Sequence, residues 1–230
     1  MYRGFVISVV IPCHNEENSI VQVITVLPSF IDEIIVVDNA STDNTSILAS
    51  NRGAKVVLEE KKGYGYAHKK GFKNAGGDII VTLDGDGQHP SNSISEIIDY
   101  IIKKDLDFVS GTRFPLKNNN SMSLLNILGN KIQTYTFRFL FGCKVLDSQS
   151  GMWLFKRDIL DRMKLTSNGM SFSEEIKIEA IQNNQICFGE FWIDHTKRIG
   201  NSKLMPWYDG FMNMIFMFKR WIQSKLYIKL

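Results

Sequence analysis

The chain has 230 residues, 44% of them hydrophobic, which suits one large folded domain with a substantial core. Lysine and arginine exceed aspartate and glutamate by only 27 − 24 = 3, which gives no indication of a nucleic-acid-binding protein. Three widely spaced cysteines exclude a zinc knuckle and a disulfide framework, and they fit a reducing cytosolic compartment. The early apolar run Phe5–Ile11 stops at Pro12, and no stretch approaches 18 uninterrupted apolar residues. Neither a signal peptide nor a spanning helix is therefore predicted.

Strand-like and helix-like segments alternate through the first half of the chain. Apolar, β-branched runs predict strands at Phe5–Ile11, Glu33–Asp38, Lys55–Leu58, Asp78–Leu83 and Asp107–Gly111. Helical patterns lie between them, at 15–27, 41–51, 64–74 and 90–103. Such alternation is typical of right-handed β-α-β units, so we expect an α/β fold with a mainly parallel sheet flanked by helices.

The pattern changes in the second half of the chain. Helices are predicted at Leu124–Phe141, Asp158–Met163 and Ser173–Asn183, and strands at Met152–Phe155 and Phe188–His195. The segment Trp207–Trp221 is crowded with Phe, Met, Ile and Trp, and basic residues follow at its end. Because no repeat or linker is evident, we predict one catalytic domain over residues 1–205 and an amphipathic C-terminal helix over 206–230.

The most informative stretch is a strand-like run, Ile79–Leu83, that leads directly into Asp84-Gly85-Asp86. Such a run delivers two carboxylates to the carboxyl edge of a sheet, where α/β folds bind their ligands. Paired carboxylates with few other ligands suit Mg²⁺ or Mn²⁺ held jointly with a substrate diphosphate. An EF-hand loop does not fit, because it needs glycine and glutamate where His89 and Ser95 stand. The Walker phosphate loop is also absent.

The ends of the first two predicted strands carry polar residues as well. Pro12-Cys13-His14-Asn15-Glu16 follows the first strand, and Asp38-Asn39-Ala40-Ser41 follows the second. Taken alone, each stretch also fits ordinary turn and cap chemistry. In order with Asp84 and Asp86, they predict a nucleotide held between two neighbouring strand ends.

Seven motifs in a fixed order give the chain its resemblance to a known family. They are Val-Ile-Pro-x-x-Asn-Glu, Val-Asp-Asn-x-Ser-x-Asp-x-Thr, Gly-Tyr-Gly-x-Ala-x-x-x-Gly, Asp-Gly-Asp-Gly-Gln-His-Pro, Gly-Thr-Arg-Phe, Asp-Ser-Gln-Ser-Gly and Arg-Ile-Gly-Asn-Ser-Lys-Leu. The chain resembles the family 2 glycosyltransferases over nearly its whole length, in particular the polyprenyl-phosphate glycosyltransferases typified by dolichol-phosphate mannose synthase. The resemblance implies a GT-A fold and metal-dependent, inverting transfer from a nucleoside-diphosphate sugar.

The resemblance also implies roles for individual residues. The donor-binding residues would be Pro12, His14, Glu16, Val37, Asp38, Asn39, Asp84, Gly85 and Asp86. The metal ligands would be Asp84, Asp86 and Gln88, and the catalytic residues would be Asp86, Arg113, Arg198 and Lys203. Two positions depart from the family pattern, because His14 stands where Tyr is frequent and Asn39 where Asp is frequent. The spacing of the late basic pair varies in the family, so Lys197 is an alternative to Arg198.

The chemistry of such a transfer agrees with these roles. The departing diphosphate gains negative charge, which a divalent cation and fixed basic side chains stabilise. An acceptor phosphate is already anionic and needs no strong general base. Arginine suits phosphate because its planar fork binds two oxygens. His68 and His195 are interpreted as structural, and His89 as shaping the turn before Pro90.

The acceptor is inferred from two apolar segments with basic flanks, Leu124–Phe141 and Trp207–Trp221. Helices of this kind lie in a membrane interface, although they also pack against a core. We therefore predict a peripheral protein on the cytosolic face of a membrane that transfers a hexose to a polyprenyl or dolichyl phosphate. Donors of the GDP-mannose and UDP-glucose type both fit the motifs.

Three rival functions stay open from the sequence. A glycan hydroxyl acceptor would need a carboxylate base, for which Glu174 or Glu175 is the best candidate. A sugar nucleotidyltransferase normally has a glycine-rich phosphate loop where this chain has Pro12–Glu16. A non-catalytic sugar-nucleotide-binding module would not need the Asp84/Asp86 pair.

Overall fold

The computed structural model describes residues 1–117, 122–200 and 206–227 of the chain. Seven strands form one sheet: β1 (Ile7–Cys13), β2 (Glu33–Asp38), β3 (Lys55–Leu58), β4 (Ile79–Thr82), β5 (Phe108–Thr112), β6 (Trp153–Lys156) and β7 (Phe188–Trp192). Their order across the sheet is β3-β2-β1-β4-β6-β5-β7. Strand β6 runs antiparallel to both β4 and β5, and the other pairs are parallel. The expected α/β fold with a mixed, mainly parallel sheet is confirmed.

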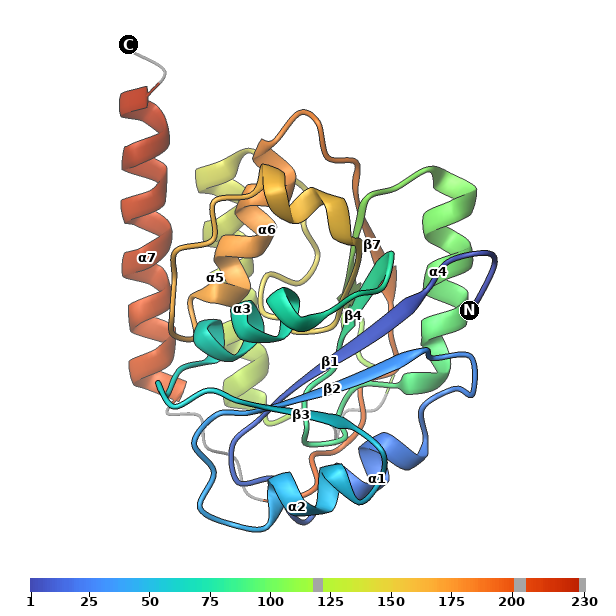
Figure 1. Cartoon of the computed structure of the whole chain (residues 1–230). Helices are drawn as coiled ribbons and strands as arrows, with labels where there is room; N and C mark the ends of the chain where they lie inside the picture. Colours follow the sequence, from blue (N-terminus) through green and yellow to red (C-terminus); the bar gives the residue numbers. More distant parts are fainter. Residues whose placement is uncertain (118–121, 201–205, 228–230) are drawn as a thin grey trace.

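Helices cover both faces of the sheet (Figure 1). They are α1 (Ile20–Thr25), α2 (Thr45–Ser50), α3 (Tyr64–Asn74), α4 (Ile94–Lys104), α5 (Leu124–Phe141), α6 (Phe172–Gln182) and α7 (Pro206–Tyr227), with 3₁₀ turns at Ser91–Ser93 and Arg157–Arg162. Successive residues of β1 point to opposite faces, so Val9 packs with the isoleucines of α1 and α4, whereas Val10 packs with α3 and α6. Burial on both faces explains why the central strands are almost continuously apolar.

Three predicted helices begin later than their sequence patterns suggest. The segment 15–19 was expected to be helical, but the backbone amides of residues 15–17 donate to side chains of the segment 41–45. Asn15 N donates to Ser41 Oγ at 3.0 Å, and Glu16 N donates to Thr45 Oγ1 at 2.8 Å. Helix α1 therefore begins only at Ile20. Similarly, α2 begins at Thr45 and α4 at Ile94, after cap and 3₁₀ residues.

A third apolar cluster joins α5, α6 and α7. Phe137 and Leu140 of α5, Ile178 of α6 and Met217 of α7 are buried together. Helix α7 lies against α5 along one side of the molecule (Figure 1). The C-terminal helix is thus docked through one face, while its other face stays exposed. The division of the chain near residue 205 stays a prediction.

Candidate active site

The predicted site residues converge because β1, β2 and β4 are adjacent parallel strands. Cys13 at the end of β1 pairs in register with Asp38 at the end of β2, and Val10 pairs with Thr82 at the end of β4. The segments that follow these strands therefore meet at one edge of the sheet, as expected for an α/β ligand site. Three motifs that lie up to 70 residues apart in sequence are brought to this edge by strand pairing alone.

On the donor side, the residues after β2 are held by hydrogen bonds within the protein. Asp38 Oδ1 accepts from Ser41 N at 2.9 Å, and its Oδ2 accepts from the Ser46 hydroxyl. The Asn39 amide nitrogen donates to the carbonyls of Glu59 and Lys61 at 3.0 and 2.8 Å. Its side-chain oxygen accepts from Gly63 N at 2.8 Å. The Asn39 side chain therefore holds the loop after β3 in place, and its expected role in donor binding stays a prediction.

The other predicted donor-binding residues differ in how far their side chains are buried. The Val37 side chain is fully buried in the core, so only its backbone could meet a nucleotide. His14 Nδ1 lies 2.9 Å from the carbonyl oxygen of Asn39, which links the ends of β1 and β2. Pro12 is partly exposed in β1, and Glu16 is largely buried beside it.

The Asp84–Gln88 turn is packed tightly against the end of β1. A Cβ atom on Gly85 would lie 2.6 Å from Cys13 Sγ, so only glycine allows this approach. Gly87 has a φ of 77°, a left-handed conformation that favours glycine. His89 Nδ1 accepts a 3.0 Å hydrogen bond from Asp84 N, so this ring does brace the turn.

Burial and mutual repulsion act on the two carboxylates of the turn. Burial, with a smaller contribution from Glu16, raises the pKa of Asp84 to about 6, although Arg113 and Arg198 act against the shift. Burial and then the Asp84 charge also raise the pKa of Asp86. A divalent cation between these groups would relieve both effects, so the pair fits a metal ion.

The ligand set for such a metal would need oxygens from outside the protein. Within residues 1–117, 122–200 and 206–227, no group of three or more His, Cys, Asp or Glu side chains surrounds a common metal position. Asp84, Asp86 and the Gln88 amide would hold a cation together with substrate phosphate oxygens, as Mg²⁺ commonly is in nucleotide enzymes. The Gln88 nitrogen already donates toward Thr196 O at 3.3 Å and lies 3.0 Å from His195 Nε2.

Arg198 lies directly on the predicted metal and donor residues. Its Nη1 is 2.5 Å from Asp86 Oδ2, and its Nη2 is 2.6 Å from Glu16 Oε1. The late loop that carries it is anchored to the turn, because Ile199 N donates to Asp86 O at 3.0 Å and Thr196 N to Gln88 O at 3.1 Å. Lys197 beside it is exposed. Lys203, the other predicted cation of this loop, lies outside the described residues.

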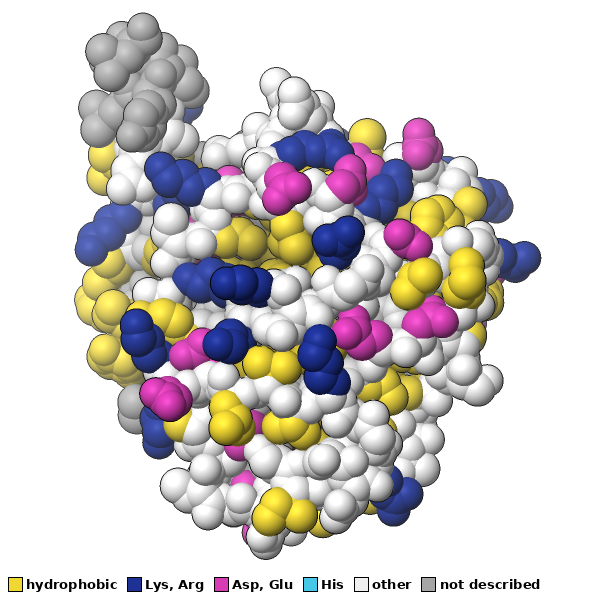
Figure 2. All heavy atoms as spheres, in the orientation of Figure 1, with side chains coloured by type: hydrophobic (Ala, Val, Ile, Leu, Met, Phe, Trp, Pro, Cys, Tyr) yellow, Lys and Arg dark blue, Asp and Glu magenta, His cyan; other side chains and the backbone are white. Residues whose placement is uncertain are grey.

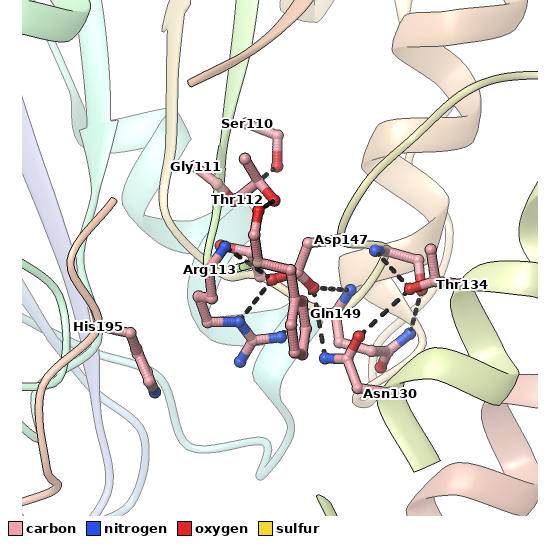
Figure 3. A network of polar contacts seen from close by, with 12 residues as sticks. Ser110, Gly111, Thr112, Arg113, Asn130, Thr134, Asp147, Gln149 and His195 are labelled. Atoms are coloured by element: carbon pink, nitrogen blue, oxygen red, sulfur yellow. Dashed lines mark hydrogen bonds and ion pairs between the residues drawn. The ribbon is translucent and has the colours of Figure 1, made fainter. Parts of the chain in front are cut away.

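Arg113 is held at the end of β5 by a buried carboxylate that the sequence reasoning did not assign. Figure 3 shows its guanidinium lying against Asp147, with Asn130 and Thr134 of α5 beyond and His195 on the opposite side. Nε and Nη2 donate to the two Asp147 oxygens at 2.6 and 2.8 Å. Arg113 and Arg198 both act electrostatically on Asp84, so each arginine lies within electrostatic reach of that carboxylate. The Asp-Ser-Gln-Ser-Gly motif was the available signal for Asp147.

The two glutamates considered as bases for a hydroxyl acceptor are fully buried. Glu175 accepts from Thr166 N, Thr166 Oγ1 and Ser167 N, so it caps the loop before α6. Glu174 accepts from the Gln149 amide at 2.6 Å, behind the Asp147 loop. Burial raises the pKa of Glu174 to about 7, although the hydrogen bond from Gln149 and the charge of Lys177 act against the shift.

Tyr64 is a site residue that the sequence reasoning missed. Its hydroxyl lies 3.4 Å from Asp84 Oδ1, and its ring packs edge-on against His68, with centroids 4.3 Å apart. The flanking glycines allow close packing, because a Cβ on Gly65 would lie 2.4 Å from Ser167 O. Asn168 O accepts from the amides of Gly65 and Tyr66 at the start of α3. This glycine pair therefore serves helix packing rather than phosphate binding.

His68, beneath Tyr64, should make stability depend on pH. Neither ring nitrogen has a hydrogen-bond partner among the described residues, and burial, with His89 adding to it, lowers the pKa of His68 to about 3. Below pH 6.5 the unfolded chain binds a proton that the folded protein does not, so stability falls with acidification. Between pH 7 and 5 this loss should be about 2 kcal/mol, and His68→Leu should remove it. Urea unfolding at both pH values measures the difference; Phe72→Leu, a neighbouring core change without a titrating group, should keep the parent's pH dependence.

Comparison with known proteins identifies the family. A model of glycosyl transferase family 2 matches residues 8–164. The chain belongs to glycosyltransferase family 2. It is 30% identical over 218 residues to the low-salt glycan biosynthesis hexosyltransferase Agl6 of Haloferax volcanii. This match covers 92% of the present chain but only 52% of the length of that relative. It is also 30% identical to a dolichyl-phosphate hexose transferase of the same organism, over 89% of each chain. A UDP-N-acetylglucosamine–dolichyl-phosphate N-acetylglucosaminyltransferase of Methanococcus voltae is 34% identical, over 67% of this chain and 70% of the relative.

Solved structures share the fold of this family 2 glycosyltransferase. Glucosyl-3-phosphoglycerate synthase from Mycobacterium tuberculosis superposes with a TM-score of 0.73 at 21% identity, over 95% of this chain and 79% of that one. That protein was crystallised with Mn²⁺, uridine diphosphate and phosphoglyceric acid. The predicted GT-A fold and the predicted family are both confirmed.

Proposed function

We propose that this glycosyltransferase moves a hexose from a nucleoside-diphosphate sugar to a polyprenyl or dolichyl phosphate, with inversion at the anomeric carbon. The observation that carries the proposal is that Arg113 and Arg198 both act electrostatically on Asp84, and Arg198 also pairs with Asp86. Two cations beside a metal-binding carboxylate pair suit a reaction with phosphates on both donor and acceptor. The relatives named as dolichyl-phosphate transferases support the same acceptor.

The reaction is a single displacement. An oxygen of the acceptor phosphate forms a bond to C1 of the hexose from the face opposite the diphosphate. The bond from C1 to the diphosphate oxygen breaks, and the nucleoside diphosphate leaves with the electron pair. Because the attacking oxygen is already anionic, no proton has to be removed. Glu175 already accepts three hydrogen bonds from the loop before α6, which disfavours a hydroxyl acceptor activated by that carboxylate.

The protein contributes to this step by holding positive charges near the phosphates before the reaction begins. A bound Mg²⁺ or Mn²⁺, held by Asp84, Asp86 and Gln88, would supply positive charge against the leaving diphosphate. Arg198 lies on Asp86 and Glu16, where it would meet the same diphosphate. Arg113, which also acts electrostatically on Asp84, would meet the acceptor phosphate. A donor of the GDP-mannose or UDP-glucose type would bind at the ends of β1 and β2.

Membrane contact is proposed for the exposed faces of α5 and α7. Apolar side chains gather along the outer edge of α7, with Lys and Arg beside them (Figure 2). Several of these side chains are more than half exposed, including Trp207 at 77% and Phe139 at 84%. The exposed apolar residues of the two helices are Leu124, Leu125, Leu128, Ile132, Tyr135, Phe139, Trp207, Tyr208, Phe211, Met212, Phe218 and Ile222. Aromatic rings on basic helices suit the headgroup level of a bilayer, and none of the described helices is long and apolar enough to cross one.

Outward substitutions on α7 test this contact. Deleting the helix would also remove Met217 from the core, so surface changes are cleaner. We expect the triple variant Trp207→Ser, Phe211→Ser, Phe218→Ser to bind anionic liposomes at least about tenfold more weakly, because each large side chain contributes roughly 1.5–3 kcal/mol when fully buried. Co-sedimentation measures the binding, and nucleotide affinity should not change.

A matched control uses exposed apolar residues elsewhere. The variant Val26→Ser, Ile47→Ser, Leu58→Ser removes three side chains that are also more than half exposed, but on other elements. It should sediment like the parent. Equal loss in both triple variants, or sedimentation of neither the parent nor the variants, would argue against an interfacial role for α7.

The proposed function is tested by a donor-by-acceptor screen. Candidate nucleotide sugars are supplied with and without a polyprenyl phosphate, in Mn²⁺ or Mg²⁺, and lipid-linked sugar is measured. We expect product from one donor and only with the lipid phosphate. Equal nucleotide release in its absence, or transfer to soluble glycans instead, would contradict the proposal.

A further inference from the structure

Asp147 is a buried carboxylate whose surroundings are fully organised. It has no exposed surface. Five N–H groups donate to it, from the Arg113 backbone at 3.2 Å, Arg113 Nε at 2.6 Å, Arg113 Nη2 at 2.8 Å, Asn130 Nδ2 at 3.3 Å and Gln149 N at 3.0 Å. Both oxygens are occupied by donors, and three of the five bonds come from one arginine.

The loop that carries Asp147 is itself clamped. The buried Lys177 ammonium donates to the carbonyl oxygens of Asp147, Ser148 and Ser150 at 3.1, 2.8 and 2.7 Å. On the other side, Glu190 accepts from the amides of Leu146 and Asp147 at 2.7 and 3.2 Å. A cation and an anion thus fix the two sides of the same short loop, so the Asp147 carboxylate cannot swing away without breaking several buried contacts.

This arrangement determines which edge of Arg113 remains available. Nε and Nη2 donate to Asp147, which leaves Nη1 and the second hydrogen of Nη2 without a partner among the described residues. The Arg113 side chain is 12% exposed whereas that of Asp147 is 0% exposed, so the open part of the pair belongs to the arginine. Arg113 also acts on Asp84, which places its guanidinium within electrostatic reach of the metal-binding pair.

The same surroundings argue against Asp147 as a proton acceptor. Arg113 and Lys177, through charge and hydrogen bonds, outweigh burial and hold the pKa of Asp147 well below its usual range. A general base works best with a pKa near the operating pH. A carboxylate that already accepts five donors has little affinity for a further proton.

We infer that Asp147 is a positioning residue that holds the Arg113 guanidinium with its free edge toward the acceptor phosphate. The inference rests on the proposed function for the identity of that phosphate. The inference goes beyond the proposed function, because it assigns the Asp-Ser-Gln-Ser-Gly loop as the support of the acceptor site. Lys177 and Glu190 hold this loop in place. Preorganised donors of this kind need no rearrangement when the ligand arrives.

A double-mutant cycle with a binding readout tests this role. The parent, Asp147→Asn, Arg113→Lys and the double variant are titrated with farnesyl phosphate, and transfer kinetics are measured alongside. Asp147→Asn should weaken farnesyl phosphate binding about ten- to a hundredfold, because charge-assisted contacts are lost, and should leave donor KM within about twofold. In the Arg113→Lys background the same change should add less than about twofold, because Asp147 acts through Arg113.

Asp107→Asn is the matched control. It removes a partly buried carboxylate from a 2.8 Å pair with Lys156, next to the opposite end of β5. It should lower thermal stability without changing farnesyl phosphate affinity. Retained nucleotide binding checks that each Asp147 variant is folded.

The titrations and kinetics have outcomes that would contradict the positioning role of Asp147. The inference fails when Asp147→Asn binds farnesyl phosphate like the parent, when its effect persists fully beside Arg113→Lys, or when the parent does not bind farnesyl phosphate at all. A loss of kcat with unchanged acceptor affinity and an altered pH profile would point to a base instead. If the parent protein binds farnesyl phosphate but transfers no sugar to prenyl phosphates, the proposed function is contradicted and the inference about Asp147 is not.

Discussion

Asp86→Asn should lower kcat/KM for hexose transfer by about 10²–10³-fold or more while the protein stays folded. The carboxylate is only 4% exposed and lies at the centre of the site, bonded to Arg198 and to the Gln88 amide. Asparagine keeps the shape of the turn but removes the charge that a divalent cation needs. Stability should not fall, because burial already raises the pKa of Asp86 and the charged form is the costly one.

Initial rates and thermal unfolding of the same preparations measure the two effects. Asp161→Asn, at an exposed carboxylate in the turn Arg157–Arg162, is the control and should behave like the parent. Excess chelator should abolish parent activity, and Mn²⁺ or Mg²⁺ should restore it. Full activity in chelator, or an Asp86→Asn enzyme within about threefold of the parent, would rule out the metal role.

Arg198→Ala should lower kcat/KM by a similar factor, about 10²–10³-fold, but with a different signature. Arg198 bridges Asp86 and Glu16, so it neutralises the carboxylates when no cation is bound. Removing it takes away a counter-charge for the diphosphate and at the same time a competitor for Asp86. We therefore expect Arg198→Ala to lose transfer activity while its affinity for Mn²⁺ stays equal to that of the parent or rises. Asp86→Asn should lose both transfer activity and Mn²⁺ affinity.

Mn²⁺ titrations beside the kinetics separate these two variants. Lys197→Ala is the matched control, because Lys197 is the adjacent exposed cation and the alternative suggested by the variable spacing of the motif. It should remain within about twofold of the parent. An inactive Lys197→Ala together with an active Arg198→Ala would move the role from Arg198 to Lys197.

The sequence predicts which residues lie at the ligand-binding edge of the sheet, but it does not predict the order of the strands. Continuous apolar runs such as Ile7–Cys13 and Ile79–Thr82 indicate buried parallel strands, and the polar residues after them must then meet at one edge. The insertion of β6 between β4 and β5 is a long-range pairing, Val81 with Leu154 and Val109 with Leu154, that no local pattern encodes. Its antiparallel direction brings Gly151 beside Asp84: a Cβ there would lie 3.3 Å from Asp84 Oδ2.

The parts of the site that escaped prediction depend on tertiary contacts. Arg113 and Asp147 are 34 residues apart, and nothing in either motif says that they pair. The bonds of the Asn39 amide to the loop at 59–63 were not predicted, because this contact depends on where β3 ends. Tyr64 was missed because its contact with Asp84, 20 residues away in sequence, depends on how α3 packs against the sheet. The start of α1 was misplaced because side chains from a second loop, rather than helical bonds, satisfy the amides of 15–17.

The most direct test of the account compares two acceptors that differ only in the phosphate. Purified protein is given Mn²⁺ and the donor that gives the highest rate, with a polyprenyl monophosphate or with the matching polyprenol in the same vesicles. Because Arg113 and Arg198 are expected to work on phosphate groups, sugar should be transferred to the monophosphate and at background rate to the alcohol. Comparable transfer to the polyprenol, or to neither lipid, would contradict the account.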